Sequence, residues 1–347
     1  MTSSLDARDL THVLDNAHLD WTDLRGARVL ITGVTGFVGS WLLETLVHAN
    51  EALGLDVHVT ALVRDRAAFT TRFPHLAAAK AVRIHVGDVR IVDPPTHAFT
   101  HYVHCASASP PKMNAERPAE VVDVIERGTE RMLEEAESAK GARFLQVSSG
   151  SVYGTVPPAV ALVDEDFDGR ADAADPAQRF GAAKWRAEQR GAAAVERGVG
   201  FVAARVFALL GPRLPLDGQF AIGNFLGDAL AGRTIRLSSD GTPVRSWMHA
   251  ADMAAWCWTL LVRGRVGAAY NVGSEEALTI WDAANLVAAL RTPPVSVERA
   301  GAAGPGQSSN RYVPSTRRAR EEFGLECRIP FDDALRRTWD WLQRDSA

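Results

Sequence analysis

The chain has 347 residues, 46% of them hydrophobic and 23% charged, so it is long enough for one large or two modest domains with ample core. Its net charge of −4, without a long basic run, argues against nucleic acid as the main partner. No apolar run approaches the roughly 20 residues of a membrane span, and the N-terminus lacks the pattern of a signal peptide. Three scattered cysteines predict a reduced, cytoplasmic protein, and ten histidines without paired ligand spacing predict no metal site.

Residues 1–25 are polar and precede the first predicted strand. Their few apolar residues leave two interpretations open. One is a short amphipathic helix that caps the domain or a neighbouring subunit, and the other is a solvated extension.

The first strand, at about 28–32, runs into Gly33, Gly36 and Gly39, and an apolar helical pattern follows. Gly33 permits a tight turn, Gly36 lets backbone N–H groups approach a pyrophosphate at the positive end of the helix, and Gly39 allows close packing. This arrangement predicts a dinucleotide site. Its predicted contacts are Gly33, Thr35, Gly36, Phe37, Val38 and Gly39.

Strands alternate with helical patterns along the next part of the chain. This alternation predicts an α/β fold with a Rossmann-type, doubly wound parallel sheet. The further strands are expected at 57–63, 82–86, 101–105, 143–148 and about 200–206, and the longest helices at 118–139 and about 176–197.

After residue 206 the regularity fades. We therefore expect an N-terminal extension (1–25), a dinucleotide-binding domain (26–206) and a smaller C-terminal substrate-binding cap. The cap takes most of 207–347, with some segments returning to the Rossmann domain, and also uses part of 153–175. Residues 290–310, rich in Pro, Gly and Ser, predict an exposed loop.

Ligands of such sheets bind at the carboxyl ends of the strands. Arg64 stands at the end of the second strand, where a basic residue suits the 2′-phosphate of NADP. NAD is possible if the adjacent Asp65 meets the ribose instead, and a solvated loop arginine is the remaining interpretation of Arg64. The other predicted cofactor contacts, each at or just beyond a strand end, are Asp88, Val89, Cys105, Ala106, Ser107 and Val206.

A hydroxyl and a lysine stand out beyond the fifth strand. Ser149 follows its end, and the FGAAK tract places Phe180 and Lys184 on one face of the predicted helix at about 176–197.

With these residues in place, the chain resembles the extended short-chain dehydrogenase/reductase family of nucleotide-sugar epimerases, dehydratases and decarboxylases. The resemblance covers about residues 27–345 and is nearest the UDP-glucuronate decarboxylase branch. The matching tracts are TGVTGFVG, GDV, HCAS, VSSGSVYG, FGAAK, ARVFALLGPR, DGTPVRSWMHAADMA, AAYNVGS and the tail that begins YVPSTRRAREEFGL.

The resemblance implies a catalytic Tyr-x-x-x-Lys pair, in which the tyrosine takes the proton of a sugar hydroxyl. It assigns Lys184 to the cofactor ribose and Ser149 to the hydroxyl partner. Phe180 occupies the tyrosine position and has no proton to exchange. Three interpretations stay open: a tyrosine replaced on purpose to trap substrate, a natural enzyme with another base, or a binding subunit without catalysis. Tyr153, Ser151 and Lys112 are the candidate replacement bases.

The residues after Ser149 separate the reactions of the family. Gly150 and Ser151 stand where the resemblance places carboxylates in dehydratases and decarboxylases, which favours an epimerase that works through a transient keto-sugar, or a keto-sugar reductase. The expected substrate is a nucleoside-diphosphate sugar, and a homodimer through the helices 118–139 and 176–197 is implied. The predicted substrate contacts are Lys112, Ser149, Ser151, Arg213, Asn224 and Arg245; Gln219 replaces an arginine of the decarboxylase tract, and Arg205 is expected to be structural.

Overall fold

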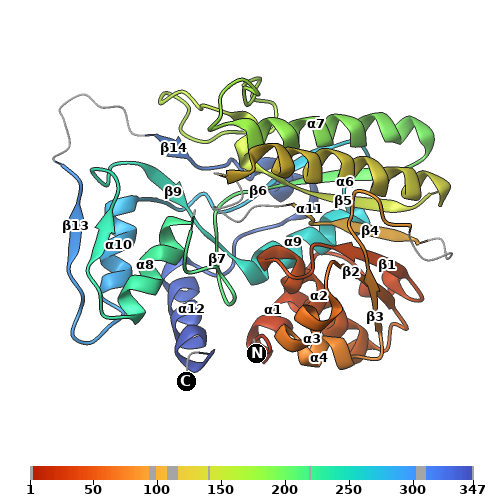
Figure 1. The fold of residues 1–347 in the computed structure, drawn as a ribbon, viewed down its shortest axis with the longest axis horizontal. Coiled ribbons are helices and arrows are strands. Elements are labelled where there is room, and N and C mark those ends of the chain that lie inside the picture. The colour runs from red at the N-terminus through yellow and green to blue at the C-terminus, as the bar shows by residue number, and fades with distance from the viewer. Residues whose placement is uncertain are drawn as a thin grey trace.

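A computed structural model describes residues 3–93, 99–107, 116–139, 141–218, 220–301 and 310–345. Its centre is a seven-stranded sheet in the order β11-β6-β5-β4-β1-β2-β3, with every neighbouring pair parallel (Figure 1). The expected doubly wound α/β sheet is confirmed. The strands are β1 (Arg28–Thr32), β2 (His58–Val63), β3 (Val82–Val86), β4 (His101–His104), β5 (Arg143–Ser149), β6 (Gly200–Val206) and β11 (Ala269–Val272).

Helices cover both faces of this sheet, which is why its central strands are buried almost throughout. In Figure 1, α6 (Pro118–Ser138) and α7 (Arg179–Ala194) lie side by side over one face. On the other face lie α2 (Phe37–Leu53) and α9 (Ala250–Arg263), which pack against each other. Short helical segments complete this layer and the connections: η1 (Trp21–Leu24), α3 (Arg66–Arg72), α4 (Pro74–Ala78), η2 (Gly150–Tyr153), η3 (Val195–Arg197) and α11 (Arg317–Phe323).

The strand order reverses at β1, and this reversal positions the site. β1 pairs with β2 on one side and with β4 on the other, so the chain crosses over after β3. Loops that leave β1 and β4 therefore diverge at their carboxyl ends, where doubly wound sheets bind ligands. The predicted cofactor residues follow these two strands and their neighbours.

The cap is built from small sheets and two helices on one side of the large sheet (Figure 1). β12 (Ala277–Thr279), β9 (Val244–Ser246) and β14 (Arg311–Tyr312) form one sheet, β8 (Ile235–Leu237) pairs with β13 (Val297–Arg299), and β7 (Leu209–Leu210) pairs with β10 (Met248–His249). The helices are α8 (Ala221–Leu230) and α10 (Ile280–Ala288), which pack together.

The prediction of a loop over 290–310 is wrong at Val297–Arg299, which form β13. The strand exists because it pairs in parallel with β8, a contact that the local composition does not show. Residues 302–309 lie outside the described residues.

The N-terminal extension forms the helix α1 (Ala7–Asn16), and of the two interpretations the capping helix is the one observed. Val13 is buried, and α1 packs against α9 and α2 of its own domain. Arg337, on the C-terminal helix α12 (Phe331–Asp345), binds the buried Asp9 at 2.8 Å. The two chain ends therefore lie together (Figure 1). Within the described residues, no helix is both long and apolar enough to cross a membrane.

Candidate active site

The glycine turn after β1 has the shape that a pyrophosphate requires. Gly33 is left-handed (φ 69°), and a Cβ there would lie 2.7 Å from the backbone of Cys105 and Ala106. A Cβ on Gly39 would lie 2.2 Å from the Gly33 carbonyl oxygen. Gly36 differs, because a Cβ there would meet only Gly33 O, at 3.3 Å. The space beside Gly36 is therefore a cradle that a side chain would fill.

The helix that follows adds positive potential to this cradle. α2 begins at Gly36 without a side-chain cap and without an acidic residue in its first turn, so its first N–H groups are not bonded by a capping side chain. Arg72 donates to the Thr35 carbonyl at 2.8 Å and brings a cation to the same turn, which the sequence motif did not indicate. The residues present fit a dinucleotide pyrophosphate.

Two residues at the end of β2, Arg64 and Asp65, are the candidates for contact with the cofactor ribose, and their surroundings differ. Asp65 caps α3 by accepting from the Ala68 N–H at 3.0 Å. Arg64 is exposed, and no hydrogen bond holds its guanidinium among the described residues. The carboxylate at this turn is thus engaged in the helix cap, while the adjacent guanidinium remains available to a ligand.

Asp88 lies beyond the end of β3, and both of its oxygens accept hydrogen bonds from Arg90. These bonds lower the pKa of Asp88, and Arg90 continues to Asp123 at 2.8 Å. The carboxylate predicted to meet adenine is therefore held in an ion-pair network. Val89 follows it and is buried.

At the end of β4 the backbone approaches the glycine turn closely. The Ala106 N–H donates to Thr32 Oγ1 at 3.1 Å, which ties the β4 and β1 ends together. Burial raises the pKa of Cys105 to about 12, so its thiol is neutral. Cys105, Ala106 and Ser107 thus form the small, uncharged wall expected beside a dinucleotide.

α7 carries Phe180 and Lys184 one turn apart, as predicted. Lys184 is buried, and its Nζ donates to the Val147 carbonyl at 2.8 Å. Its ammonium lies 5.8 Å from the centre of the Phe180 ring. Burial lowers the pKa of Lys184 to about 8, while the nearby Glu188 opposes that shift. The lysine is therefore pre-positioned at the carboxyl end of β5.

Ser149 ends β5 and is surrounded by hydroxyl groups. Its Oγ accepts the Ser151 hydroxyl at 2.8 Å and the Ser151 N–H at 3.2 Å. Tyr312, which the sequence assigned no role, places its hydroxyl at Gly150, the residue after Ser149. Burial raises the pKa of Tyr312 to about 12, and the nearby Ser149 hydroxyl opposes that rise. Ser149, Ser151 and Tyr312 thus meet at one point.

The replacement base Tyr153 does not reach this point. It is buried, its hydroxyl donates to Asn271 Oδ1 at 2.7 Å, and it accepts from Arg205 at 2.9 Å. Arg205 also pairs with the buried Glu188 at 2.8 Å, which confirms that Arg205 is structural. Glu188 in turn accepts from Ser148, the residue before Ser149. Sequence patterns did not indicate this network beneath the site.

Arg213 requires a correction. We expected its guanidinium to bind a substrate phosphate, but the side chain is fully buried and pairs with Glu44 of α2. It also donates to the Ser3 carbonyl at 3.0 Å. Because a buried charge needs its partner, this arginine is not offered to a ligand, and we do not carry it into the proposed site.

The other predicted substrate contacts lie in the cap or outside the described residues. Arg245 on β9 pairs in register with Tyr312 on β14, and its guanidinium carbon lies 5.8 Å from the Tyr312 ring centre. Asn224 lies on α8 and donates to Gly218 O at 2.9 Å. Val206 ends β6 beside Ser149 in the β5–β6 register. Lys112 and Gln219 lie outside the described residues.

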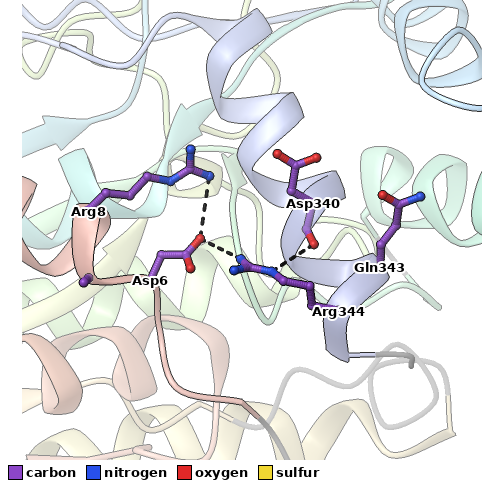
Figure 2. Close-up of a pocket in the computed structure, with 6 residues that line it drawn as sticks. Asp6, Arg8, Asp340, Gln343 and Arg344 are labelled. Carbon is purple, nitrogen blue, oxygen red and sulfur yellow. Dashed lines mark hydrogen bonds and ion pairs between the residues drawn. The ribbon is translucent and has the colours of Figure 1, made fainter.

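Two further features do not contribute to this site. A surface groove of about 600 Å³ lies between the chain ends, where Arg344 binds Asp6 at 2.7 Å, and none of the predicted site residues lines it (Figure 2). In the part of the chain that the structure describes, no group of three or more His, Cys, Asp and Glu side chains is arranged to hold a metal ion.

Comparison with known proteins matches residues 29–273 to the NAD dependent epimerase/dehydratase family. Over 322 residues, 92% of this chain, the chain is 27% identical to UDP-glucuronic acid decarboxylase 1 of Danio rerio, covering 73% of that protein. It is 26% identical over 329 residues to dTDP-glucose 4,6-dehydratase of Streptomyces niveus, covering 92% of this chain and 94% of that one.

Solved structures share the fold. An epimerase of Methanothermobacter thermautotrophicus superposes with a TM-score of 0.79 at 21% identity, covering 97% of both chains. UDP-glucuronic acid 4-epimerase of Bacillus cereus, solved with UDP-glucuronic acid and NAD, superposes with a TM-score of 0.77 at 19% identity. That match covers 91% of this chain and 99% of the other.

Proposed function

Because the chain belongs to the NAD-dependent epimerase/dehydratase family, we propose that it epimerises a nucleoside-diphosphate sugar through a transient keto-sugar. The observation that carries the proposal is the alignment of three features at one edge of the sheet. These are the cradle beside Gly36, the buried ammonium of Lys184 and the hydroxyl of Ser149. The cradle beside Gly36 suits a pyrophosphate. The Lys184 ammonium and the Ser149 hydroxyl suit a sugar hydroxyl that is oxidised and then reduced.

The protein residues bind and orient rather than supply the redox chemistry. A bound nicotinamide dinucleotide would accept a hydride from the sugar and return it. Gly33 and Gly36 would hold its pyrophosphate, and Lys184 its ribose hydroxyls. Ser149 would hydrogen-bond the reacting sugar oxygen and hold it at the end of β5. Arg245, as a planar donor fork, would bind the diphosphate of the substrate.

Small residues after Ser149 support epimerisation over the reactions named for the two curated relatives. Gly150 and Ser151 offer no carboxylate for elimination or decarboxylation. A keto-sugar reductase would tolerate the same residues, and a binding subunit without catalysis would explain Phe180.

A panel of nucleotide sugars with NADP or NAD separates these functions. Interconversion of sugar isomers without net change of the cofactor supports the epimerase. Stoichiometric loss of NADPH indicates the reductase. Release of carbon dioxide or water indicates a decarboxylase or a dehydratase. Tight sugar binding without turnover indicates the binding subunit. Any of the last three results would replace the epimerase proposal.

We further propose NADP as the preferred cofactor, because Arg64 is available while Asp65 is engaged as a helix cap. Replacing Arg64 with alanine removes a charged donor that is worth about 1.5–3 kcal/mol to a 2′-phosphate. The affinity for NADP should fall roughly 10–100-fold, while the affinity for NAD should not change. Isothermal titration with both cofactors measures this. An equal change for both would show that Arg64 does not face the ribose.

Two glycine variants test the pyrophosphate cradle. Gly36→Ala should lower the melting temperature only slightly, because its Cβ would make one tight contact, 3.3 Å from Gly33 O, but it should weaken dinucleotide binding by roughly tenfold or more. Gly39→Ala is the matched contrast, because its Cβ would lie 2.2 Å from Gly33 O and should destabilise the fold itself. Calorimetry and thermal unfolding measure the two effects. Unchanged dinucleotide binding by Gly36→Ala would show that the space beside Gly36 does not hold the pyrophosphate.

We propose a homodimer through α6 and α7, as the family resemblance implies, and a cytoplasmic location, as the three scattered cysteines indicate. The two helices pack side by side, and Arg186 on α7 binds Glu126 on α6. Sedimentation analysis of the purified protein tests the dimer, and a monomer throughout the concentration range would contradict it.

A further inference from the structure

The position of each tyrosine limits which phenol can act at the site. The chain has four tyrosines, all in its described parts. Tyr102 is buried between aromatic rings of the sheet core. Tyr153 is bound to Asn271 and Arg205, and Tyr270 donates to Glu322 at 2.5 Å. Tyr312 is the tyrosine whose hydroxyl lies at the end of β5, against Gly150 and next to Ser149.

The strand pairing and the ring contacts hold Tyr312 in this place. β14 pairs with β9 so that Tyr312 lies opposite Arg245, and its ring packs against Phe207 with centres 4.6 Å apart and planes tilted by 35°. A Cβ on Gly150 would lie 2.6 Å from the Tyr312 hydroxyl oxygen. The phenol therefore reaches the end of β5 only because residue 150 has no side chain. Gly150 therefore admits the Tyr312 phenol to the end of β5, while Phe180 provides no phenol from α7.

We propose that Tyr312 is the proton carrier of this enzyme and performs, from the cap, the task that Phe180 cannot perform from α7. This inference rests on the proposed function. When the sugar is oxidised, the hydroxyl proton passes to the Tyr312 phenolate oxygen, and a bound oxidised nicotinamide dinucleotide would accept the hydride with its electron pair. A carbon–oxygen double bond forms. In the return step the hydride adds to the other face of that carbon, and Tyr312 gives the proton back.

The surroundings of Tyr312 determine when it can act as a base. Burial raises its pKa to about 12, whereas hydrogen bonding to Ser149 and the charge of Arg245 oppose that rise. Ser149 from β5 and Arg245 from β9 are the polar groups that face it, and Phe207 is apolar. Because the phenolate is the basic form, kcat/KM for sugar oxidation should increase with pH over the alkaline range. This increase should disappear without Tyr312.

Tyr312→Phe tests the inference with the least structural change. A positioned base is worth about 10²–10⁴ in rate, so kcat should fall by that factor. Binding of UDP should stay within about threefold of wild type, because the diphosphate contact is untouched. Tyr270→Phe is the matched control: it removes a hydrogen-bonded phenol elsewhere and should keep kcat within about twofold.

Adding Phe180→Tyr to the Tyr312→Phe variant provides a test that a merely structural role would not pass. The double variant should regain most of the lost turnover, because it places a phenol beside Lys184 again. Phe180→Tyr alone should raise kcat less than about tenfold, since the wild type already has a base. If this single variant instead rises by about 10²–10⁴, the wild type lacks a base and the inference is overturned, while the proposed binding of cofactor and sugar stands.

Ultraviolet difference spectra give a readout independent of turnover. The positive charge of an oxidised nicotinamide should lower the pKa of a phenol beside it, so adding NADP at about pH 9 should produce a tyrosinate signal. The signal should appear in wild type and in Tyr270→Phe and be absent in Tyr312→Phe. A signal that persists in Tyr312→Phe, or full activity of that variant, overturns the inference. Failure of the wild type to bind cofactor and sugar would instead refute the proposed function.

Discussion

Replacing Glu188 with glutamine should lower the free energy of unfolding by about 3–5 kcal/mol, because it leaves the Arg205 charge buried without its partner. The two side chains are only 6% and 5% exposed, and three hydrogen bonds join them. Glu188 also accepts from Ser148, so the variant removes support directly beneath Ser149. Chemical denaturation measures the loss, and kcat should fall with it as the end of β5 loosens.

The exposed pair of Arg236 and Glu298 is the matched control. Its side chains are 71% and 58% exposed, so Glu298→Gln should change stability by at most about 1 kcal/mol. A loss of unfolding free energy of similar size in both variants would show that burial does not increase the contribution of the Arg205–Glu188 pair to stability. Replacing both Arg205 and Glu188 with apolar residues should lower the free energy of unfolding less than Glu188→Gln does, because no buried charge then lacks a partner.

Replacing Lys184 with methionine should lower kcat by about 10²–10³ and yet stabilise the protein. The catalytic loss is expected because a buried ammonium beside Ser149 is removed from the site. The stabilisation follows from the pKa. Burial lowers it to about 8, against about 10.4 in an unfolded chain, so at neutral pH the fold holds an ammonium at a cost of about 3 kcal/mol. The lost hydrogen bond to Val147 offsets about 1 kcal/mol of the gain.

The sign of this effect depends on pH in a defined way. The folded-state pKa of Lys184 is depressed, so wild-type stability falls as pH decreases from about 10 to about 8 and is constant below. The advantage of Lys184→Met should therefore be about 2 kcal/mol at pH 7 and turn into a loss of about 1 kcal/mol above about pH 10. Denaturation curves at several pH values measure it. A difference that is independent of pH would show that the fold does not depress the pKa of Lys184.

The parts of the site that the sequence predicted are those that depend on local patterns. The glycine turn, the strand ends and the shared face of Phe180 and Lys184 follow from spacing within a few residues. The structure places them as expected at one edge of the sheet. The helix α1 was one of two interpretations, because apolar periodicity alone does not say what covers it.

The parts that could not be predicted depend on contacts between distant segments. Arg213 resembled a phosphate ligand in its GPR tract, but its partner Glu44 lies 169 residues away. Tyr312 meets Ser149 only because β14 pairs with β9, and no local pattern marks either short strand. The clearest sequence signal of an unusual site was indirect. Residue 150 is a glycine and has no side chain, and residue 180 is a phenylalanine and has no hydroxyl. The phenylalanine indicated that the tyrosine base is missing and the glycine that a carboxylate is missing, but neither pointed to Tyr312.

The most direct test of the account follows the hydrogen on the reacting carbon. UDP-glucose and UDP-glucuronic acid, each deuterated at carbon 4, would be incubated with the protein and a catalytic amount of NADP or NAD. The account predicts an epimer that keeps its deuterium, with no net reduction of the cofactor and a primary isotope effect on kcat. Loss of the deuterium to solvent, or accumulation of reduced cofactor, would contradict epimerisation through a transient keto-sugar.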